Sequence, residues 1–152
     1  MILNLSEQKL SIPEGTEDVL GLDMRYREHI INIIKEVYEN YGFNPHKTPI
    51  LEYLETFNGH HGEGEKLALH IKDKNDKDLI ARYDLTVPLA RVASMYPDLP
   101  RPYKRYQIGP SFRDDEPGKS HFREFTQCDA DIIGADSLLA EIDITVMAHE
   151  LL

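Results

Sequence analysis

Two arginines flank a charged turn within residues 106–125, and their spacing suits the binding of a nucleotide. Arg113 leads into the turn, and Arg123 follows it shortly before Phe125. Arginine presents a planar fork to phosphate and stacks on flat rings. Strands on either side of a turn hold such groups more rigidly than a free loop does. The alternative is a solvated hairpin with surface charges, and this stretch alone favours neither.

A second polar cluster lies in residues 82–88, where a predicted strand runs into a predicted helix. Asp84 and Thr86 could accept hydrogen bonds from the ammonium group of a substrate. The alternative is that Thr86 caps the helix while Asp84 is solvated, and this cluster alone favours that simpler interpretation.

A third polar cluster follows the turn, in residues 124–134. Because side chains alternate along a strand, Gln127, Asp129 and Asp131 project to one face. Such a face is either open to solvent or the floor of a polar pocket. Without context, the solvent face is the safer interpretation.

Other common site motifs are missing from the sequence. His60 and His61 are adjacent rather than at helical ligand spacing, so a surface loop is favoured and no metal site is predicted. The chain has no phosphate loop of the Walker type and no nucleophile elbow.

The elements that position these clusters follow from apolar periodicity. The apolar positions from Tyr26 to Tyr41 predict a helix, which Gly42 ends with a left-handed cap. Residues 43–50 are expected to be extended because of their prolines. Residues 66–83 alternate as a hairpin, with Leu67, Leu69 and Ile71 on one face and a turn at residues 74–77.

The second half of the chain predicts two helices around two long strands. Thr86 is expected to cap a short helix, which the prolines after residue 96 end. Strands are predicted over residues 103–112 and 122–133, on either side of the arginine turn. Asp136 or Ser137 is expected to cap a last helix.

Composition places the chain among ordinary globular proteins of one domain. It has 152 residues, of which 41% are hydrophobic and 29% charged. The net charge of −10 argues against a generally basic nucleic-acid surface. The single cysteine, Cys128, excludes an internal disulfide and predicts a cytoplasmic location. The sequence predicts no membrane span and no signal peptide.

Five short motifs occur in a fixed order along the chain. The motifs are Pro13-x-Gly15-Thr16-x-Asp18, Thr48-Pro49-Ile50-Leu51-Glu52, Gly62-Glu63-Gly64-Glu65-Lys66-Leu67, Arg82-Tyr83-Asp84-Leu85-Thr86-Val87-Pro88 and Phe122-Arg123-Glu124-Phe125-Thr126-Gln127-Cys128-Asp129. Each motif is weak alone, but the ordered set is specific and covers nearly the whole chain from Pro13. The set resembles the histidyl-tRNA synthetases, which are class II aminoacyl-tRNA synthetases.

The resemblance implies an α+β fold, in which an antiparallel class II sheet is flanked by helices. Residues 1–152 would be the N-terminal portion of the catalytic core, incomplete because the third family motif and the anticodon-binding domain are absent. A homodimer would form around Pro49. The implied activity is ligation of histidine to tRNA-His through histidyl-adenylate, with ATP as substrate and Mg²⁺ as its companion ion.

The same resemblance implies roles for individual residues. The histidine ammonium would be held by Asp84 and Thr86, and the rest of histidine by Gln127 and Asp131. ATP would be bound by Arg113, Arg123 and Phe125. Arg113 would contact the α-phosphate as the catalytic residue, and Phe125 would stack on adenine.

Two departures from the family pattern keep an alternative open. His121 stands where the family usually has an arginine in the turn, which predicts a weaker phosphate contact. The chain also ends before the third motif, which predicts that these residues are inactive alone. The alternative is a non-catalytic, synthetase-like regulatory subunit of ATP phosphoribosyltransferase. His121 and the short length favour it, whereas Arg113, Phe125, Gln127 and Asp131 favour the synthetase.

Overall fold

The computed structural model describes residues 10–57, 67–116, 118 and 121–152. The helices are α1 (Gly21–Asn40), α2 (Leu54–Phe57), α4 (Thr86–Met95) and α5 (Leu139–Leu151). The strands are β1 (Asn44–Pro45), β2 (Leu51–Tyr53), β3 (Leu69–Lys72), β4 (Asp78–Ala81), β5 (Tyr103–Phe112) and β6 (Glu124–Ile133). The His60-His61 pair and most of the motif that begins at Gly62 lie outside the described residues.

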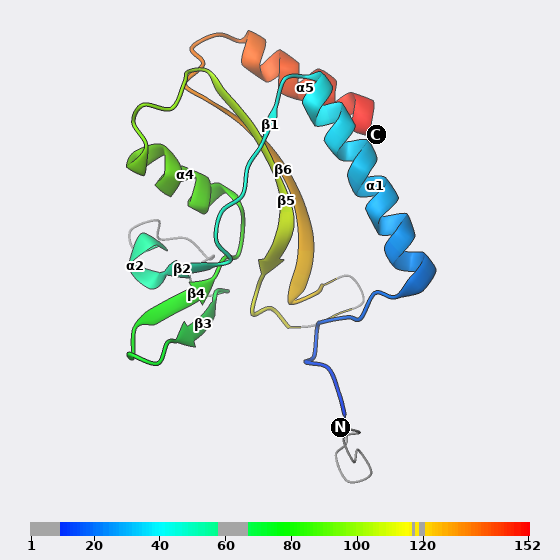
Figure 1. The fold of residues 1–152 in the computed structure, drawn as a ribbon, viewed down its shortest axis with the longest axis vertical. Helices are drawn as coiled ribbons and strands as arrows, with labels where there is room; N and C mark the ends of the chain where they lie inside the picture. The colour runs from blue at the N-terminus through cyan, green and yellow to red at the C-terminus, as the bar shows by residue number, and fades with distance from the viewer. Residues whose placement is uncertain (1–9, 58–66, 117, 119–120) are drawn as a thin grey trace, which may run out of the picture.

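Within the described residues, the strands form two small sheets (Figure 1). In the larger sheet, of order β1-β5-β6, the long strands β5 and β6 are antiparallel and β1 runs parallel to β5. The smaller sheet has the order β2-β4-β3 and is antiparallel throughout. The predicted α+β fold with a largely antiparallel sheet is confirmed, and the parallel pairing of β1 is its one exception among the described strands.

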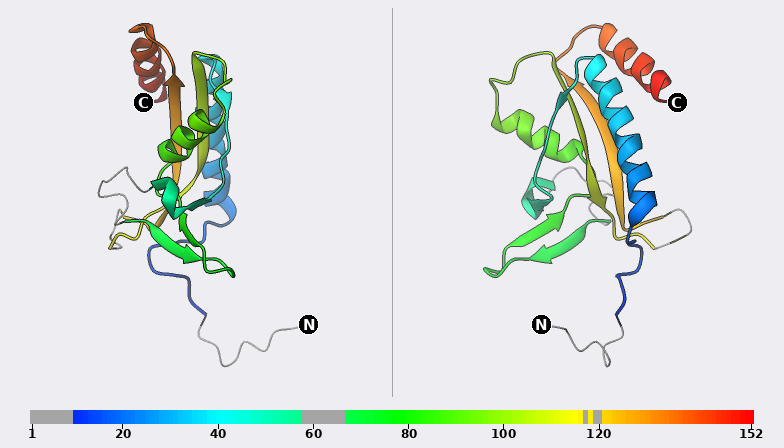
Figure 2. Two further views of the ribbon diagram at one scale, coloured as in Figure 1. Left: turned by 90° about the vertical axis from the view of Figure 1, so that its left-hand side faces the viewer. Right: turned by 45° about the vertical axis from the view of Figure 1, so that its right-hand side comes forward.

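One face of β5 and β6 is apolar and carries the main core. Tyr106 and Ile108 on β5 share this face with Ala130 and Ile132 on β6, because side chains alternate along each strand. Helices α1 and α5 cover the face, while α4 lies on the other side of the strands (Figures 1 and 2). The buried members of this core are Val37, Tyr38, Phe43, Tyr106 and Met147. The apolar face thus leaves the opposite face of the two strands for polar side chains.

Helix α1 follows the predicted period and ends as predicted. Gly42 has φ of 77° and donates its N–H to the carbonyl of Glu39 at 2.9 Å, which is the left-handed cap expected of glycine. Only the C-terminal part of the helix is buried, at Val37 and Tyr38. Tyr26 and Ile30, on the predicted apolar stripe, are more than half exposed at 59% and 57%.

The predicted hairpin forms, and it buries residues on both of its faces. Strands β3 and β4 pair as expected, and the turn closes when Asp73 accepts the N–H groups of Asn75 and Lys77. The buried residues are Ala68 and Ile80, which pack against Phe57. On the face predicted from alternation, Ala81 is also buried, at 5%, whereas Ile71 is 38% exposed. Alternation fixes which residues share a face, but not which face meets the neighbouring helix.

Of the caps predicted for α4 and α5, the first is wrong and the second is confirmed. Thr86 was expected to cap α4, but it is the first helical residue and its side chain is exposed. The cap comes from Asp84, whose Oδ1 accepts the N–H of Val87 at 3.1 Å. For α5, the prediction of Ser137 is confirmed, since its hydroxyl accepts the N–H of Leu139 at 3.2 Å.

Candidate functional site

The polar face of β5 and β6 forms the floor of the candidate site. Three of its side chains on β5, those of Arg105, Gln107 and Ser111, are almost fully buried, with exposures of 0%, 3% and 0%. On β6, Asp131 lies opposite Arg105, and Asp129 lies opposite Gln107. The third polar cluster of the sequence therefore lies on a partly buried face rather than on one fully open to solvent.

A buried ion-pair cluster holds this floor together. The Nη2 group of Arg105 donates to Oδ2 of Asp129 at 2.8 Å and pairs with Oδ2 of Asp131. It also donates to the carbonyl of Leu85 at 3.3 Å, just before helix α4. Burial and the neighbouring Asp129 raise the pKa of Asp131, while the positive charge of Arg105 opposes that rise.

Gln127 and Phe125 continue the floor toward the arginine turn. The amide oxygen of Gln127 accepts the hydroxyl of Ser111 at 3.0 Å, which fixes its orientation. The guanidinium of Arg113 lies over the ring of Phe125, 4.9 Å from its centre. Arg113 also donates weakly to the carbonyl of Tyr83 at 3.4 Å. The structure thus brings Arg113, Phe125 and Gln127 into one row.

Asp84 reaches the same site from the start of α4. Burial raises its pKa, as does the negative charge of Asp129, while the N–H groups of Val87 and Thr86 and the charge of Arg113 lower it. The charges of Asp129 and Arg113 thus both act on the Asp84 carboxylate. Thr86 follows on the first turn of α4, with an exposed side chain.

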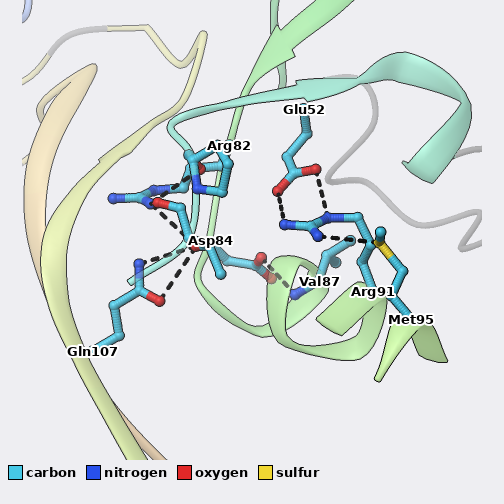
Figure 3. A network of polar contacts seen from close by, with 9 residues as sticks. Glu52, Arg82, Asp84, Val87, Arg91, Met95 and Gln107 are labelled. Atoms are coloured by element: carbon cyan, nitrogen blue, oxygen red, sulfur yellow. Dashed lines mark hydrogen bonds and ion pairs between the residues drawn. The ribbon is translucent and has the colours of Figure 1, made fainter. Parts of the chain in front are cut away.

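Arg82 fixes the segment that carries Asp84 (Figure 3). It is 3% exposed and donates to the carbonyl oxygens of Thr48, Pro49 and Pro110 at 2.9, 3.2 and 2.9 Å. A methyl group at position 109 would lie 2.9 Å from its Nη2 atom, so Gly109 makes room for the guanidinium. Arg82 therefore joins the smaller sheet to β5 directly beside the site.

A second ion pair anchors α4 behind Asp84. Arg91 donates through two nitrogen atoms to the two carboxylate oxygens of Glu52 on β2, both at 2.8 Å (Figure 3). Glu52 is 6% exposed, so this fork-to-fork pair is largely shielded from water. Helix α4 is thus held against the smaller sheet through Arg91, in the second half of the helix.

Arg123 lies at the rim of the site rather than on its floor. Its Nε donates to the carbonyl of Asp115 at 3.1 Å, and its Nη2 lies 3.3 Å from Oδ1 of Asp114. Its backbone N–H donates to the carbonyl of Gly15 at 2.7 Å, which ties the leader segment to the turn. His121 pairs with Gly118 through the backbone, and its expected effect on phosphate binding stays a prediction.

Most of the predicted residues come together, and two partners were missed. Asp84, Arg113, Phe125, Gln127 and Asp131 share one site, whereas Thr86 and Arg123 lie at its edges. Arg105 and Ser111 were not among the predicted site residues. The signal available for them is a set of polar residues at alternate positions, 105, 107 and 111, in a strand whose only other charged residue is Lys104.

The described residues hold no group of three or more His, Cys, Asp or Glu side chains that could bind a metal ion. Among them there is also no helix of the length and apolar character needed to cross a membrane.

Comparison with known proteins gives one consistent answer. A family model described as histidyl-tRNA synthetase matches residues 15–152. The histidine–tRNA ligase of Gloeobacter violaceus is 42% identical over 90% of this chain, and that of Bacteroides fragilis is 41% identical over the same share. These alignments cover 34% and 35% of the two relatives, so the chain spans about a third of their length.

Solved structures agree with the sequence relatives. The crystal structure of histidyl-tRNA synthetase from Nostoc sp. PCC 7120 matches 94% of this chain and 34% of its own, with a TM-score of 0.81 and 30% identity. A Bacillus halodurans structure, titled as an ATP phosphoribosyltransferase regulatory subunit/histidyl-tRNA synthetase, matches 94% of this chain and 37% of its own with a TM-score of 0.84. Its 22% identity makes it evidence for the fold alone. The chain belongs to the histidyl-tRNA synthetase family and has the fold of its class II catalytic domain.

Proposed function

We propose that this chain is part of a histidine–tRNA ligase and that it supplies much of the pocket in which histidine is activated by ATP. The observation that carries the proposal is the polar floor of β5 and β6, where Gln127 and Asp131 lie in line with the Arg113–Phe125 stack. A domain that spans about a third of its relatives cannot by itself stand for their whole activity.

Histidine has three recognisable groups, and the floor offers a partner of suitable chemistry for two of them. Its ammonium group suits the Asp84 carboxylate, with the Thr86 hydroxyl beside it at the start of α4. Its imidazole N–H suits the Asp131 carboxylate, and Gln127 can complete the contact because Ser111 orients its amide. The third group, the carboxylate of histidine, would then point toward Arg113.

Activation would join the histidine carboxylate to the α-phosphorus of ATP. A carboxylate oxygen forms the new bond to phosphorus, the bond to the bridging oxygen of the β-phosphate breaks, and pyrophosphate leaves with that electron pair. Negative charge gathers on the α-phosphoryl oxygens, where the Arg113 guanidinium would stabilise it. Loss of one preorganised donor of this kind typically costs about 2.7–4 kcal/mol of transition-state stabilisation.

Adenine would stack on Phe125, with Arg123 holding the turn that encloses the phosphates. In the free protein the Arg113 guanidinium already lies on the Phe125 ring, so adenine and Arg113 compete for one ring face. The hydrogen bond from Arg113 to Tyr83 is long, at 3.4 Å, and is readily given up. Arg113 would therefore turn from the ring toward the α-phosphate when ATP binds.

The described residues offer no metal cluster of their own. Mg²⁺ usually reaches nucleotide sites on the phosphates with one or two carboxylates. It would accompany ATP here and supply charge neutralisation at the phosphates, while the residues of this chain position the nucleotide around it.

The direct test is calorimetric titration of the chain with histidine, with ATP, and with lysine and glutamine as competing amino acids. We expect saturable binding of histidine and ATP and no heat from lysine or glutamine. We also expect no histidine-dependent exchange of pyrophosphate into ATP from residues 1–152 alone, since the relatives are about three times as long. Equal binding of all three amino acids would contradict the proposal.

The regulatory alternative predicts a different partner. A non-catalytic subunit would form a complex with ATP phosphoribosyltransferase, which can be measured by co-purification of the two proteins. The synthetase proposal predicts no such complex. Relatives that are 40–42% identical to this chain carry the name histidine–tRNA ligase, which favours the synthetase.

We also propose that the protein is a cytoplasmic homodimer and that it binds tRNA-His. The segment expected at the dimer interface includes Pro49, whose carbonyl Arg82 holds in place. Ile50 and Leu51 beside it are 43% and 46% exposed, so apolar surface is available there. Light scattering of the purified chain would give its mass, and a monomer at high concentration would contradict this part.

A further inference from the structure

We propose that Arg105 is a positioning residue of the histidine pocket, whose buried guanidinium bridges Asp129 and Asp131 and fixes the Asp131 carboxylate toward the imidazole of bound histidine. This inference rests on the proposed function for the identity of the ligand. Its physical content, a carboxylate clamp beneath the pocket, can be tested without any ligand.

The geometry of the clamp follows from the register of β5 and β6. Arg105 lies directly opposite Asp131, and its side chain extends along the polar face as far as Asp129, the next residue on that face. The side chain of Arg105 has no exposure, whereas those of Asp129 and Asp131 keep 20% and 31%. The cation is therefore fully buried, whereas the two anions keep contact with solvent.

The bond to Leu85 extends the clamp to the other half of the pocket. Arg105 donates to the carbonyl of Leu85, and Leu85 follows Asp84 directly in the chain. One guanidinium thus contacts the strand that carries Asp131 and the helix start that carries Asp84. A change at Arg105 is expected to alter the spacing between the two carboxylates proposed for histidine.

An ordinary structural ion pair is the competing explanation, and the donors of Arg105 argue against it. Within the described residues, its buried Nε and Nη1 groups have no hydrogen-bond partner. Buried polar groups are nearly always satisfied, either by the protein or by ordered water. Arg82, which is equally buried, uses both Nε and Nη1 on carbonyl oxygens. The bonds of Arg105 go instead mostly to the carboxylates of the site.

Several charged or titratable groups surround the clamp, and each bears on its electrostatics. Asp129 raises the pKa of Asp131 and also that of Asp84. From helix α1, Tyr38 has its pKa raised to about 12, chiefly by burial. From the segment after β1, His46 has its pKa lowered by burial and by the positive charge of Arg105. Arg105 is the buried cation that opposes the crowding of Asp129 and Asp131.

The expected consequence is that Arg105 keeps Asp131 ionised as a hydrogen-bond acceptor. Two neighbouring carboxylates without a cation share a proton, because both cannot stay ionised at low cost. A protonated Asp131 would offer a donor where the imidazole N–H needs an acceptor. Histidine binding would then become dependent on pH near neutrality.

The test is a carbon-detected NMR titration of the aspartate carboxyl groups from pH 4 to 9, in the unchanged chain and in Arg105→Met. The substitution keeps an unbranched side chain of similar reach and removes the charge. We expect the titration midpoint of Asp131 to rise by about 1–3 pH units. Arg105→Lys should restore part of the difference, since lysine supplies the charge without the fork. An unmoved midpoint in Arg105→Met would overturn the inference.

Lys104→Met is the matched control. Lys104 precedes Arg105 on β5 and points to the opposite face, where it pairs with Asp143 at 2.6 Å. The substitution Lys104→Met removes one positive charge from the same strand, as Arg105→Met does. We expect the midpoint of Asp131 to stay unchanged, and a shift equal to that of Arg105→Met would mean that general charge, rather than the clamp, is responsible.

A measurement on the unchanged chain keeps the inference testable if Arg105→Met fails to fold. The side-chain N–H signals of Arg105 should exchange slowly with solvent and should weaken in Asp129→Asn and Asp131→Asn. The exposed Arg25 provides the reference for fast exchange. Exchange of Arg105 as fast as that of Arg25 would exclude the clamp.

Histidine titration of the same samples separates this inference from the proposed function. We expect Arg105→Met to weaken histidine binding by about tenfold, as loss of a supporting partner typically does, with the loss growing below neutral pH. If Arg105→Met binds histidine as well as the unchanged chain does and the titration midpoint of Asp131 stays the same, Arg105 has no such role although the proposed function stands. If Asp131 shifts but the unchanged chain binds no histidine, the clamp exists and the proposed function is wrong.

Discussion

Two buried arginines, Arg82 and Arg105, lie on the same side of β5 and do different work. Arg82 is 3% exposed and donates to backbone carbonyl oxygens from segments far apart in the chain. Arg105 has no exposure and directs its charge at Asp129 and Asp131. Burial alone therefore does not distinguish an arginine that stabilises the fold from one that belongs to the site. The two are distinguished by their hydrogen-bond acceptors, which are backbone carbonyl groups for Arg82 and mainly carboxylates for Arg105.

The difference has a physical basis in what each arginine leaves behind when it is removed. Loss of the Arg82 side chain leaves the carbonyl groups that it contacts without these donors and weakens the connection of the smaller sheet to β5, which lowers stability. Loss of Arg105 leaves two carboxylates that can take up a proton, so part of the cost is relieved by titration. The first substitution should break the fold, and the second should change the site.

The largest effect is expected for Arg82→Met. The free energy of unfolding should fall by about 3–5 kcal/mol, because the carbonyl groups of Thr48, Pro49 and Pro110 lose a charged donor. Urea denaturation followed by circular dichroism measures this loss. Arg82→Lys should recover only part of it, since an ammonium group cannot span all three carbonyl oxygens. If Arg82→Met lowers the free energy of unfolding less than a substitution at an exposed position does, the structural role of Arg82 is contradicted.

The next largest effect is expected for Glu52→Gln, which removes the charge of the pair that anchors α4. Both oxygens of Glu52 accept from Arg91 at 2.8 Å in a site that is largely shielded from water. The free energy of unfolding should fall by about 1.5–3 kcal/mol, the range for hydrogen bonds to charged groups.

Glu17→Gln is the control for Glu52→Gln. Glu17 pairs with Arg27 at 2.7 Å, but both side chains are more than 40% exposed. An exposed pair is worth less than about 1 kcal/mol, so urea denaturation should detect little change. Equal losses from the two substitutions would show that shielding does not matter here.

Asp84→Asn should have the smallest effect on stability and a large one on binding. Burial raises the pKa of Asp84 above its unfolded value, so its contribution to stability is present at low pH and is lost as pH rises through the folded pKa. Asparagine caps a helix as well as aspartate does. We expect the variant to gain stability relative to the unchanged chain between pH 4 and pH 7, as measured by urea denaturation at both. Histidine binding should be lost. If the stability of the variant relative to the unchanged chain falls as pH rises, the claim that burial raises the pKa of Asp84 is contradicted.

Local patterns in the sequence predicted the elements that carry the site. The period of α1, the glycine cap at Gly42 and the two long strands around the arginine turn are all confirmed. Alternation on β6 correctly placed Gln127, Asp129 and Asp131 on one face. Each of these follows from neighbours within a few residues, which is the range over which propensity and periodicity act.

The features that were missed depend on contacts between distant segments. Arg105 meets Asp131 only because of the register of β5 with β6, which no local pattern specifies. Ala68 and Ile80 are buried because Phe57 packs on their side of the hairpin. Asp84 replaced Thr86 as the cap of α4 because the helix begins at Thr86 itself, two residues beyond the carboxylate. The role of each residue was set by tertiary packing.

The central claim is that the polar face of β5 and β6, with the start of α4, binds histidine. Chemical-shift mapping of backbone amides during a histidine titration of the chain tests it most directly. The account predicts that the largest shifts fall at Asp84, Thr86, Gln127, Asp129 and Asp131, and that they are absent when lysine is added instead. Shifts concentrated on α1 and α5, on the opposite face of the sheet, or no shifts at saturating histidine would contradict it.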